Sequence, residues 1–145
     1  MTAAAFLTPT FVEFVPAVLE DGVMYISIEY KTSSHLCACG CGRRVVTPLS
    51  PLDWSLEYDG ESVSLNPSIG NWDFACQSHY IVHRGAIHWA AAWSQDQIER
   101  GRRRDLAAKL GLDASEATAT VDGPAPRPGA STWRRRLAEL VRSWR

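Results

Sequence analysis

The cysteines constrain this chain more than any other feature of its sequence, because all of them fall in two short clusters. The stretch HLCACGCG carries three at alternate positions, and CQSHY carries the fourth: Cys37, Cys39, Cys41 and Cys76. Zinc binds thiolates from two such clusters when a fold brings them side by side. Gly40 and Gly42 give the backbone the freedom that a tight turn around an ion requires. The fold therefore has to place the first cluster beside the second.

A zinc site is the interpretation that best fits this spacing. His79 follows Cys76 at the short spacing of a zinc knuckle. The four cysteines, His79 and His35 are therefore six candidates for four positions, and three cysteines with one histidine would close a tetrahedral site. His35 lies beside the first cluster and is either a further ligand or a polar residue of the site. The sequence does not distinguish a closed site of four protein ligands from an open site that keeps one position for water.

Two other roles for the cysteines fit the sequence less well. A disulfide between Cys37 and Cys39 would be strained, and structural disulfides are rare in the reducing compartment that we expect for this chain. A thiol nucleophile formed by Cys39 with His79 or His35 is a second alternative, which the crowding of thiols disfavours.

The composition is that of an ordinary soluble globular protein, with 46% hydrophobic and 21% charged residues over 145 positions. No apolar run reaches the roughly 18 residues of a membrane span, and the N-terminus lacks the basic start of a secretory signal, so we expect a cytoplasmic protein. The charge is uneven, with −6 over residues 1–98 and +5 over residues 99–145. The basic part predicts a surface helix and tail that meet an acidic partner or the acidic body itself.

Period-two patterns predict a small antiparallel sheet in the first two thirds of the chain. Residues 23–30 alternate most clearly, and residues 10–19 and 44–49 are candidates for an edge strand and a short strand. Residues 54–65 form a predicted hairpin around Asp59-Gly60, residues 66–74 a predicted loop, and residues 79–90 a predicted second hairpin.

The period changes after residue 93. Ser94 and Gln97 make a capping box for a helix that ends near Gly111, with a break plausible at Gly101. The expected fold class is α+β, a small antiparallel β-rich zinc-binding domain followed by C-terminal helices. The predicted parts are a zinc-binding domain, a helix, a linker and a basic amphipathic helix: 1–95, 96–112, 113–130 and 131–145.

Two further residues are candidates for chemistry. A hydrolytic zinc needs a general base, and Glu29 stands at the end of the clearest strand, although a solvated carboxylate on the outer face of the sheet is the plainer interpretation. Ser68 and Asn71 lie in NPSIGN, which either contacts a substrate or forms a tight turn bonded to its own backbone.

The stretches CACGCG, PSIGN and CQSHY together resemble a small bacterial family catalogued as domain of unknown function 6527, over roughly residues 10–95. The resemblance implies a place beside bacterial ubiquitin-like conjugation genes and the activity of a zinc peptidase that processes or removes the modifier. It also implies that the four cysteines and His79 belong to the metal site. Glu29 and His35 would then be acid–base candidates, and Ser68 a residue of the site.

The expected function is therefore a zinc-dependent peptidase or isopeptidase acting on a bacterial ubiquitin-like modifier. In that mechanism a zinc-activated water attacks the carbonyl, and Glu29 takes the proton. The alternative is a binding module with a purely structural zinc, an adaptor for the modifier or its conjugating enzyme. Nucleic acid is not an expected partner, since the Arg runs lack interleaved aromatic residues. A membrane is not an expected partner either, and self-association through the last helix is a further expectation.

Overall fold

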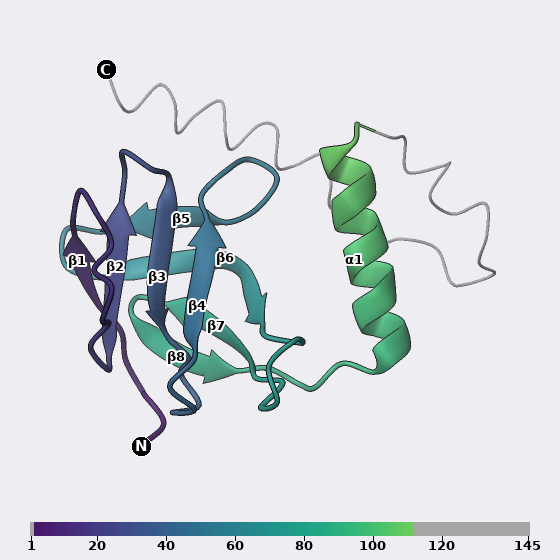
Figure 1. Cartoon of the computed structure of the whole chain (residues 1–145), viewed down its shortest axis with the longest axis horizontal. Helices are drawn as coiled ribbons and strands as arrows, with labels where there is room; N and C mark the ends of the chain where they lie inside the picture. The colour runs from purple at the N-terminus through teal and green to yellow at the C-terminus, as the bar shows by residue number, and fades with distance from the viewer. Residues whose placement is uncertain (1, 112–145) are drawn as a thin grey trace. The chain divides into compact units, whose positions relative to one another are not determined.

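A computed structural model describes residues 2–111 of the chain (Figure 1). It contains eight strands and one helix. Their bounds are β1 Thr8–Phe11, β2 Val23–Ser27, β3 Thr32–Leu36, β4 Arg44–Pro48, β5 Ser55–Tyr58, β6 Val63–Gly70, β7 His79–His83, β8 Ala86–Trp89 and α1 Gln95–Lys109. The predicted linker 113–130 and the predicted helix 131–145 lie outside the described residues.

The strands form two four-stranded sheets, and in each sheet the strands follow one another in chain order. The first sheet has the order β1-β2-β3-β4, with β1 parallel to β2 and all other pairs antiparallel. The second sheet, β5-β6-β7-β8, is antiparallel throughout. This arrangement confirms the predicted α+β class with its small antiparallel-rich β region.

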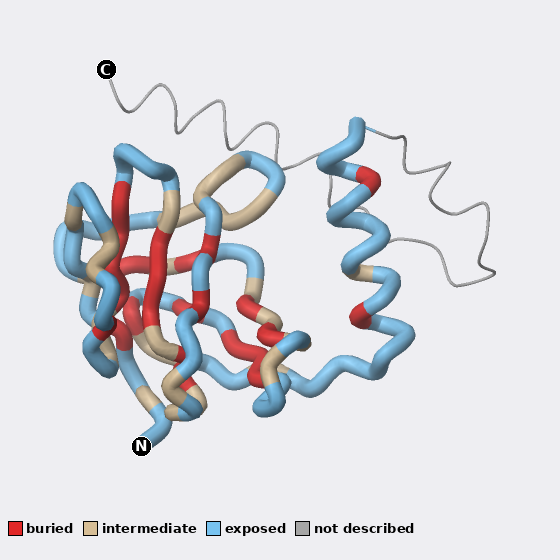
Figure 2. Tube along the Cα trace, in the orientation of Figure 1, coloured by how far each residue is buried: buried red, intermediate tan, exposed pale blue. Residues whose placement is uncertain are grey.

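A single cluster of buried side chains draws on both sheets. Met24 and Ile26 contribute from β2, Leu65 from β6, and Tyr80 and Val82 from β7. Figure 2 shows the buried segments running along the middle of strands in both sheets. Full burial of a side chain of this size stabilises the fold by about 1.5–3 kcal/mol before the conformational entropy is subtracted, so this cluster is what holds the two sheets together.

Four strands differ from the prediction. The edge strand predicted within residues 10–19 is β1, which lies at Thr8–Phe11 and pairs parallel with β2. The strand predicted for 23–30 ends at Ser27, and Ile28 and Tyr30 are exposed in the following turn. The strand β3 was not predicted, because its residues are mostly polar, yet its Ser33 hydroxyl is buried in a hydrogen bond with Thr47 of β4. The segment 66–74, predicted as a loop, continues β6 as far as Gly70 across a register shift that follows Leu65.

The chain divides into two compact units, Met1–Arg102 and Arg103–Arg145, and α1 crosses their boundary. Within the first unit the capping box is confirmed: the Ser94 N–H donates to Gln97 Oε1 at 2.8 Å, and the Gln97 N–H donates to Ser94 Oγ at 3.3 Å. No break occurs at Gly101, where an added Cβ would come within 3.2 Å of the Trp93 ring. Of the second unit the structure describes residues 103–111, which complete α1. No helix within residues 2–111 is long and apolar enough to span a membrane.

Candidate active site and cysteine cluster

The four cysteines meet in one group, whose sulfur atoms all lie within 4.8 Å of one another. The sulfur of Cys37 lies 3.4 Å from that of Cys39 and 3.9 Å from that of Cys76, and Cys41 lies 3.8 Å from Cys76. Four sulfurs bonded to one tetrahedral zinc at about 2.3 Å stand about 3.8 Å apart, so the observed spacing fits such an ion. None of the cysteines forms a disulfide. The predicted meeting of the two cysteine clusters is confirmed.

Two turns supply these sulfurs. The first joins β3 to β4, where the Cys37 N–H donates to Arg43 O at 2.8 Å and the Gly40 N–H donates to Cys37 O at 3.0 Å. Gly40 has a φ of 84°, in the left-handed region, and an added Cβ would lie 2.9 Å from the carbonyl oxygen of Thr2. The second turn joins β6 to β7 and carries Cys76.

The thiols of the group differ in pKa. Burial raises the pKa of Cys37, and burial also raises the pKa of Cys39 to about 12. At Cys76 burial acts in the same direction, but hydrogen bonds from Ser78 and neighbouring thiols outweigh it and lower the pKa to about 7. Four thiolates at this separation repel one another, so a divalent ion is needed to hold them all ionised.

Two polar side chains connect the cysteine group to the ends of β6 and β7. The Asn71 Nδ2 donates to Ser78 Oγ at 2.9 Å and to Cys37 Sγ at 3.7 Å, and Ser78 Oγ lies 3.0 Å from Cys37 Sγ. Asn71 follows Gly70, the last residue of β6, and Ser78 precedes His79, the first residue of β7. Both connecting residues are buried.

His79 lies against Ser68 and not among the sulfurs. Its Nε2 is 2.9 Å from Ser68 Oγ, and its Nδ1 is 2.7 Å from the carbonyl oxygen of Ala91. A carbonyl oxygen can only accept a hydrogen bond, so Nδ1 carries the proton and Nε2 is free to accept from the Ser68 hydroxyl. This is the geometry of a nucleophile and its general base, with the base oriented by a third group.

Aromatic rings enclose the imidazole of His79. The ring of Trp72 lies 5.0 Å from it and that of Trp93 5.3 Å, centroid to centroid, and the two indoles stack on each other at 5.4 Å with 20° between their planes. Trp72 also covers Gly70, where an added Cβ would lie 2.5 Å from the indole. His79 is buried as a result, with 8% of its surface exposed.

His35 is buried in the core against Tyr80. Its Nε2 lies 2.8 Å from the hydroxyl oxygen of Tyr80, and its Nδ1 is buried without a hydrogen-bond partner. Burial lowers the pKa of His35 to about 4 and raises the pKa of Tyr80, so both side chains are held neutral. The sulfur group does not include His35. The neutral imidazole of His35 is therefore part of the interior next to the turn between β3 and β4.

Glu29 lies away from the cysteines. It is exposed in the turn between β2 and β3, next to the end where β3 begins at Thr32, whereas Cys37 follows the other end of β3 at Leu36. A five-residue strand rising about 3.3 Å per residue separates the two ends by roughly 13 Å. The structure therefore does not bring Glu29 to the position that a zinc-activated water would need.

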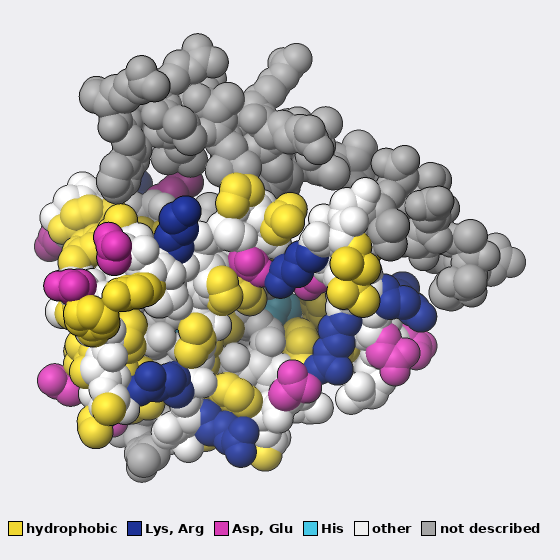
Figure 3. Space-filling view, turned by 45° about the horizontal axis from the view of Figure 1, so that its top comes forward, with side chains coloured by type: hydrophobic (Ala, Val, Ile, Leu, Met, Phe, Trp, Pro, Cys, Tyr) yellow, Lys and Arg dark blue, Asp and Glu magenta, His cyan; other side chains and the backbone are white. Residues whose placement is uncertain are grey.

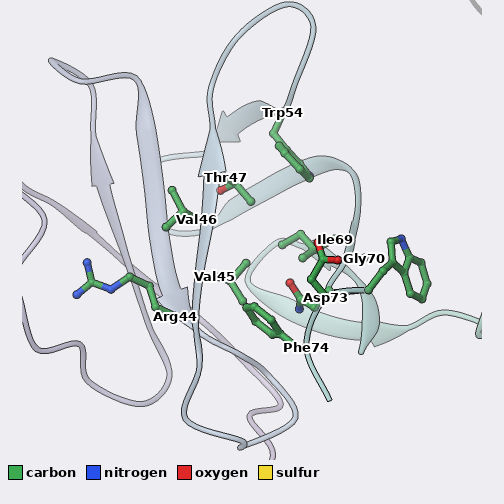
Figure 4. Close-up of a pocket in the computed structure, with 11 residues that line it drawn as sticks. Arg44, Val45, Val46, Thr47, Trp54, Ile69, Gly70, Asp73 and Phe74 are labelled. Atoms are coloured by element: carbon green, nitrogen blue, oxygen red, sulfur yellow. The ribbon is translucent and has the colours of Figure 1, made fainter. Parts of the chain in front are cut away.

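A pocket of about 280 Å³ opens between β4 and the segment that follows Ser68. Figure 4 shows Val45 and Thr47 of β4 directed toward it, with Ile69 and Phe74 across from them and Trp54 at one end. Gly70 and Trp72, which contact each other beside His79, also line it. The pocket and the Ser68–His79 pair therefore share a wall.

Charged side chains of both signs are mixed on one face of the protein. On the face shown in Figure 3, Lys and Arg side chains lie among Asp and Glu side chains instead of forming one basic patch. Within the first unit, Arg102 is paired with Asp73 at 2.6 Å. Nucleic-acid binding usually depends on a continuous basic surface.

Comparison with protein families settles the broader identity. The model of a family described as bacterial ubiquitination-like system serine protease (BubE) matches residues 11–90, more than half of the chain. The chain belongs to the BubE family. Comparisons with curated proteins and with solved structures returned no match. Membership of BubE supports the predicted link to bacterial ubiquitin-like systems, whereas identity with the family catalogued as domain of unknown function 6527 stays a prediction.

The family description contradicts the predicted zinc-dependent hydrolysis, because it names a serine protease. The geometry gives a physical reason for the correction. Four sulfurs within 4.8 Å would complete a tetrahedral shell around a zinc ion by themselves and would leave no position for a reactive water. The prediction that the chain is a peptidase of a ubiquitin-like system agrees with the family description, and the part that fails is the metal mechanism.

The sequence selected both members of the Ser68–His79 pair but not their pairing. Ser68 was expected as a residue of the site and His79 as a metal ligand, and their separate roles stay predictions. The third partner is the main-chain carbonyl of Ala91, which any residue type would supply, so the sequence does not indicate it. Trp93 could have been suspected as an aromatic residue just ahead of a helix cap, although nothing in the sequence connects it to His79.

Proposed function

We propose that this chain is a serine protease of a bacterial ubiquitination-like system, with Ser68 as nucleophile and His79 as general base. The observation that carries the proposal is the 2.9 Å contact between Ser68 Oγ and His79 Nε2, with Nδ1 held by Ala91 O. The substrate is a peptide or isopeptide bond that follows the extended tail of a ubiquitin-like modifier. The name of the family supports this choice of substrate.

The reaction follows the chemistry of acyl transfer. Ser68 Oγ attacks the carbonyl carbon while its proton passes to His79 Nε2, and the imidazolium then gives that proton to the departing amine. An acyl-enzyme remains on Ser68. A water molecule that gives its proton to Nε2 then attacks the ester, and the carboxylate of the tail leaves as Ser68 regains its proton. The Ala91 carbonyl keeps Nδ1 protonated throughout, which fixes the tautomer that the first step requires.

We assign a structural zinc to the four cysteines. The sulfur spacing fits a closed tetrahedral site. The ion would supply a cross-link between the β3–β4 turn and the β6–β7 turn, and it has no part in bond breaking. Because Asn71 and Ser78 contact Cys37, this cross-link steadies the ends of the strands that carry Ser68 and His79.

The proposed nucleophile is tested with a fluorophosphonate probe, which labels an activated serine irrespective of the natural substrate. Wild-type protein should be labelled at one site, located at Ser68 by mass spectrometry, and Ser68→Ala should not be labelled. Ser55→Ala is the matched control, since Ser55 lies on the same sheet and bonds only the carbonyl of Asn66. Labelling of wild-type protein at another residue, or its absence from folded, zinc-loaded protein, would reject Ser68 as the nucleophile and favour the adaptor alternative.

A further inference from the structure

At the outer edge of β4 the Trp54 N–H donates to Pro48 O at 3.1 Å, whereas no strand among residues 2–111 pairs with the main chain of Val46. β4 is the last strand of the first sheet. The Cys37 N–H bonds Arg43 O and the Leu49 N–H bonds Lys31 O, both in the register that places Ser34 opposite Val46. Hydrogen-bonded pairs alternate along an antiparallel ladder, so the N–H and C=O of Val46 point away from β3. Val46 is also half exposed.

The last residues of β6 carry a second uncovered edge. The Asn71 N–H donates to Ser78 O at 2.9 Å, in the register that pairs Gly70 with His79. By the same alternation, the N–H and C=O of Gly70 point away from β7. β5 covers that side of β6 only as far as Asn66, which pairs with Ser55 at the start of β5. The main chain at Gly70 is therefore open on the side facing away from β7.

The pocket lies between these two edges. It is lined by Val45, Val46 and Thr47 of β4 and by Ile69 and Gly70 of β6, and Figure 4 shows the two groups on opposite sides of it. Its floor is mostly apolar, and its rim presents unpaired N–H and C=O groups. At 280 Å³ it is smaller than most small-molecule sites, so it suits one side chain of a longer ligand.

We propose that an extended polypeptide, the tail that precedes the cleaved bond, binds along the free edge of β4 by strand addition, with one apolar side chain in this pocket. The inference rests on the proposed function, since it supplies the substrate of Ser68. Main-chain pairing with Val46 gives affinity, and the pocket gives specificity for alternate side chains of the tail. Gly70, two residues after Ser68, borders the same pocket, so a tail held there passes beside the nucleophile.

The first test measures binding without catalysis. Ser68→Ala protein is titrated with a fluorescent eight-residue peptide that has the C-terminal sequence of the ubiquitin-like protein of the same system. A set of peptides carries a single N-methyl group at successive positions, which removes one N–H donor at a time. Strand pairing predicts that affinity falls at every second position, by about three- to tenfold, with little change between. A loss without this alternation, or no measurable binding of any peptide, would overturn the proposal.

The second test changes the protein. Val46→Pro removes an N–H that takes no part in the β3–β4 ladder, so the sheet should keep its stability while the peptide binds about tenfold more weakly. Val46→Ala keeps the N–H and is the reference for Val46→Pro, so a loss of affinity that both variants share is assigned to the side chain and only the further loss in Val46→Pro to the N–H. Circular dichroism melting of each variant checks folding. If Val46→Pro melts like its control and binds the peptide equally well, β4 is not the docking edge.

The two experiments distinguish a wrong docking site at β4 from a wrong nucleophile at Ser68. Fluorophosphonate labelling reports Ser68 and needs no tail, whereas peptide binding to Ser68→Ala needs no nucleophile. Labelling with no periodic effect of N-methylation leaves the serine protease standing and removes the β4 site. Binding with the expected alternation but without labelling leaves the β4 site standing and removes Ser68 as the nucleophile.

Discussion

The cysteine group and the Ser68–His79 pair stand on the same pair of strand ends, yet they are built in opposite ways. The cysteine group uses four identical side chains that satisfy one another at 3.4–3.9 Å and would close around an ion. The pair uses two unlike side chains, polarised by a main-chain carbonyl, beside an open pocket. In the proposed function the first would stabilise the fold and the second would carry out the reaction.

The two regions are nevertheless connected. Asn71 and Ser78 bond the sulfur of Cys37 on one side, and on the other they directly adjoin Gly70 and His79 in the chain. Loss of the proposed ion should therefore disturb the pair, whereas loss of the pair should leave the sulfurs unchanged. Substitutions in one region should therefore affect the other region unequally.

The largest effect is expected for His79→Gln. Loss of the general base should lower kcat/KM for cleavage of a modifier fusion by about 10²–10⁴-fold, because Ser68 can no longer transfer its proton. The bound zinc, counted by atomic absorption, should be unchanged. A fall in zinc content with His79→Gln would show that His79 belongs to the metal site and would merge the two regions.

Cys76→Ser should affect both regions. Loss of one ligand weakens the metal site, so we expect less bound zinc and a melting midpoint lower by about 10 °C or more. Fluorophosphonate labelling of Ser68 should also slow, because the turn between β6 and β7 is no longer fastened. Labelling at the wild-type rate in folded, zinc-free Cys76→Ser would show that the two regions are independent.

A smaller effect is expected at Trp93, which packs on both Trp72 and His79. Trp93→Ala should lower kcat by about tenfold with KM nearly constant, since a loosened imidazole misses the geometry that Ser68 needs. Trp93→Phe keeps an aromatic face and should recover most of the rate. A rise in KM alone would assign Trp93 to substrate binding, and equal loss in Phe and Ala would argue against a role in positioning.

The smallest effect is expected at Asp59, in the hairpin at the far end of β6. Its carboxylate accepts from Ser62 and Glu61, and these hydrogen bonds lower the pKa of Asp59 to about 2. A lowered pKa in the folded state gives stability that is present above the ordinary value near 4 and is lost as the pH falls toward 2.

The measurement is the difference in urea midpoint between wild type and Asp59→Ala at each pH, so that acid effects common to both proteins cancel. We expect the difference to shrink between pH 4 and pH 2. Labelling of Ser68 at neutral pH should be the same in both proteins. A difference independent of pH would show that the Asp59 carboxylate is not what stabilises the hairpin.

Much of the β-rich body could be predicted because its hairpins carry both alternation and turn residues, as at Asp59-Gly60 and Arg84-Gly85. The cysteine group could be predicted because chemically identical residues at short spacing have few other uses. β3 could not, since its buried Ser33 and His35 form hydrogen bonds with partners 14 and 45 residues away. Propensity alone cannot supply such distant hydrogen bonds.

The contact between Ser68 and His79 could not be predicted from the sequence, for a different reason. It depends on the register shift between Leu65 and Ile69, and a one-residue slip moves a side chain to the other face of a sheet. A segment predicted as a loop, residues 66–74, has no predicted strand register, so the direction of the Ser68 side chain could not be predicted. The two residues could be selected individually, but their contact could not be derived.

The partner of His79 Nδ1 has a consequence for how this protein tolerates change. Every amino acid has a carbonyl group, so substitutions at position 91 should leave the hydrogen bond in place as long as the backbone keeps its path. Adding or removing one residue between Trp89 and Trp93 would shift that carbonyl out of reach without altering any side chain of the pair. Variation in length, more than variation in residue type, should therefore separate active from inactive relatives in this segment.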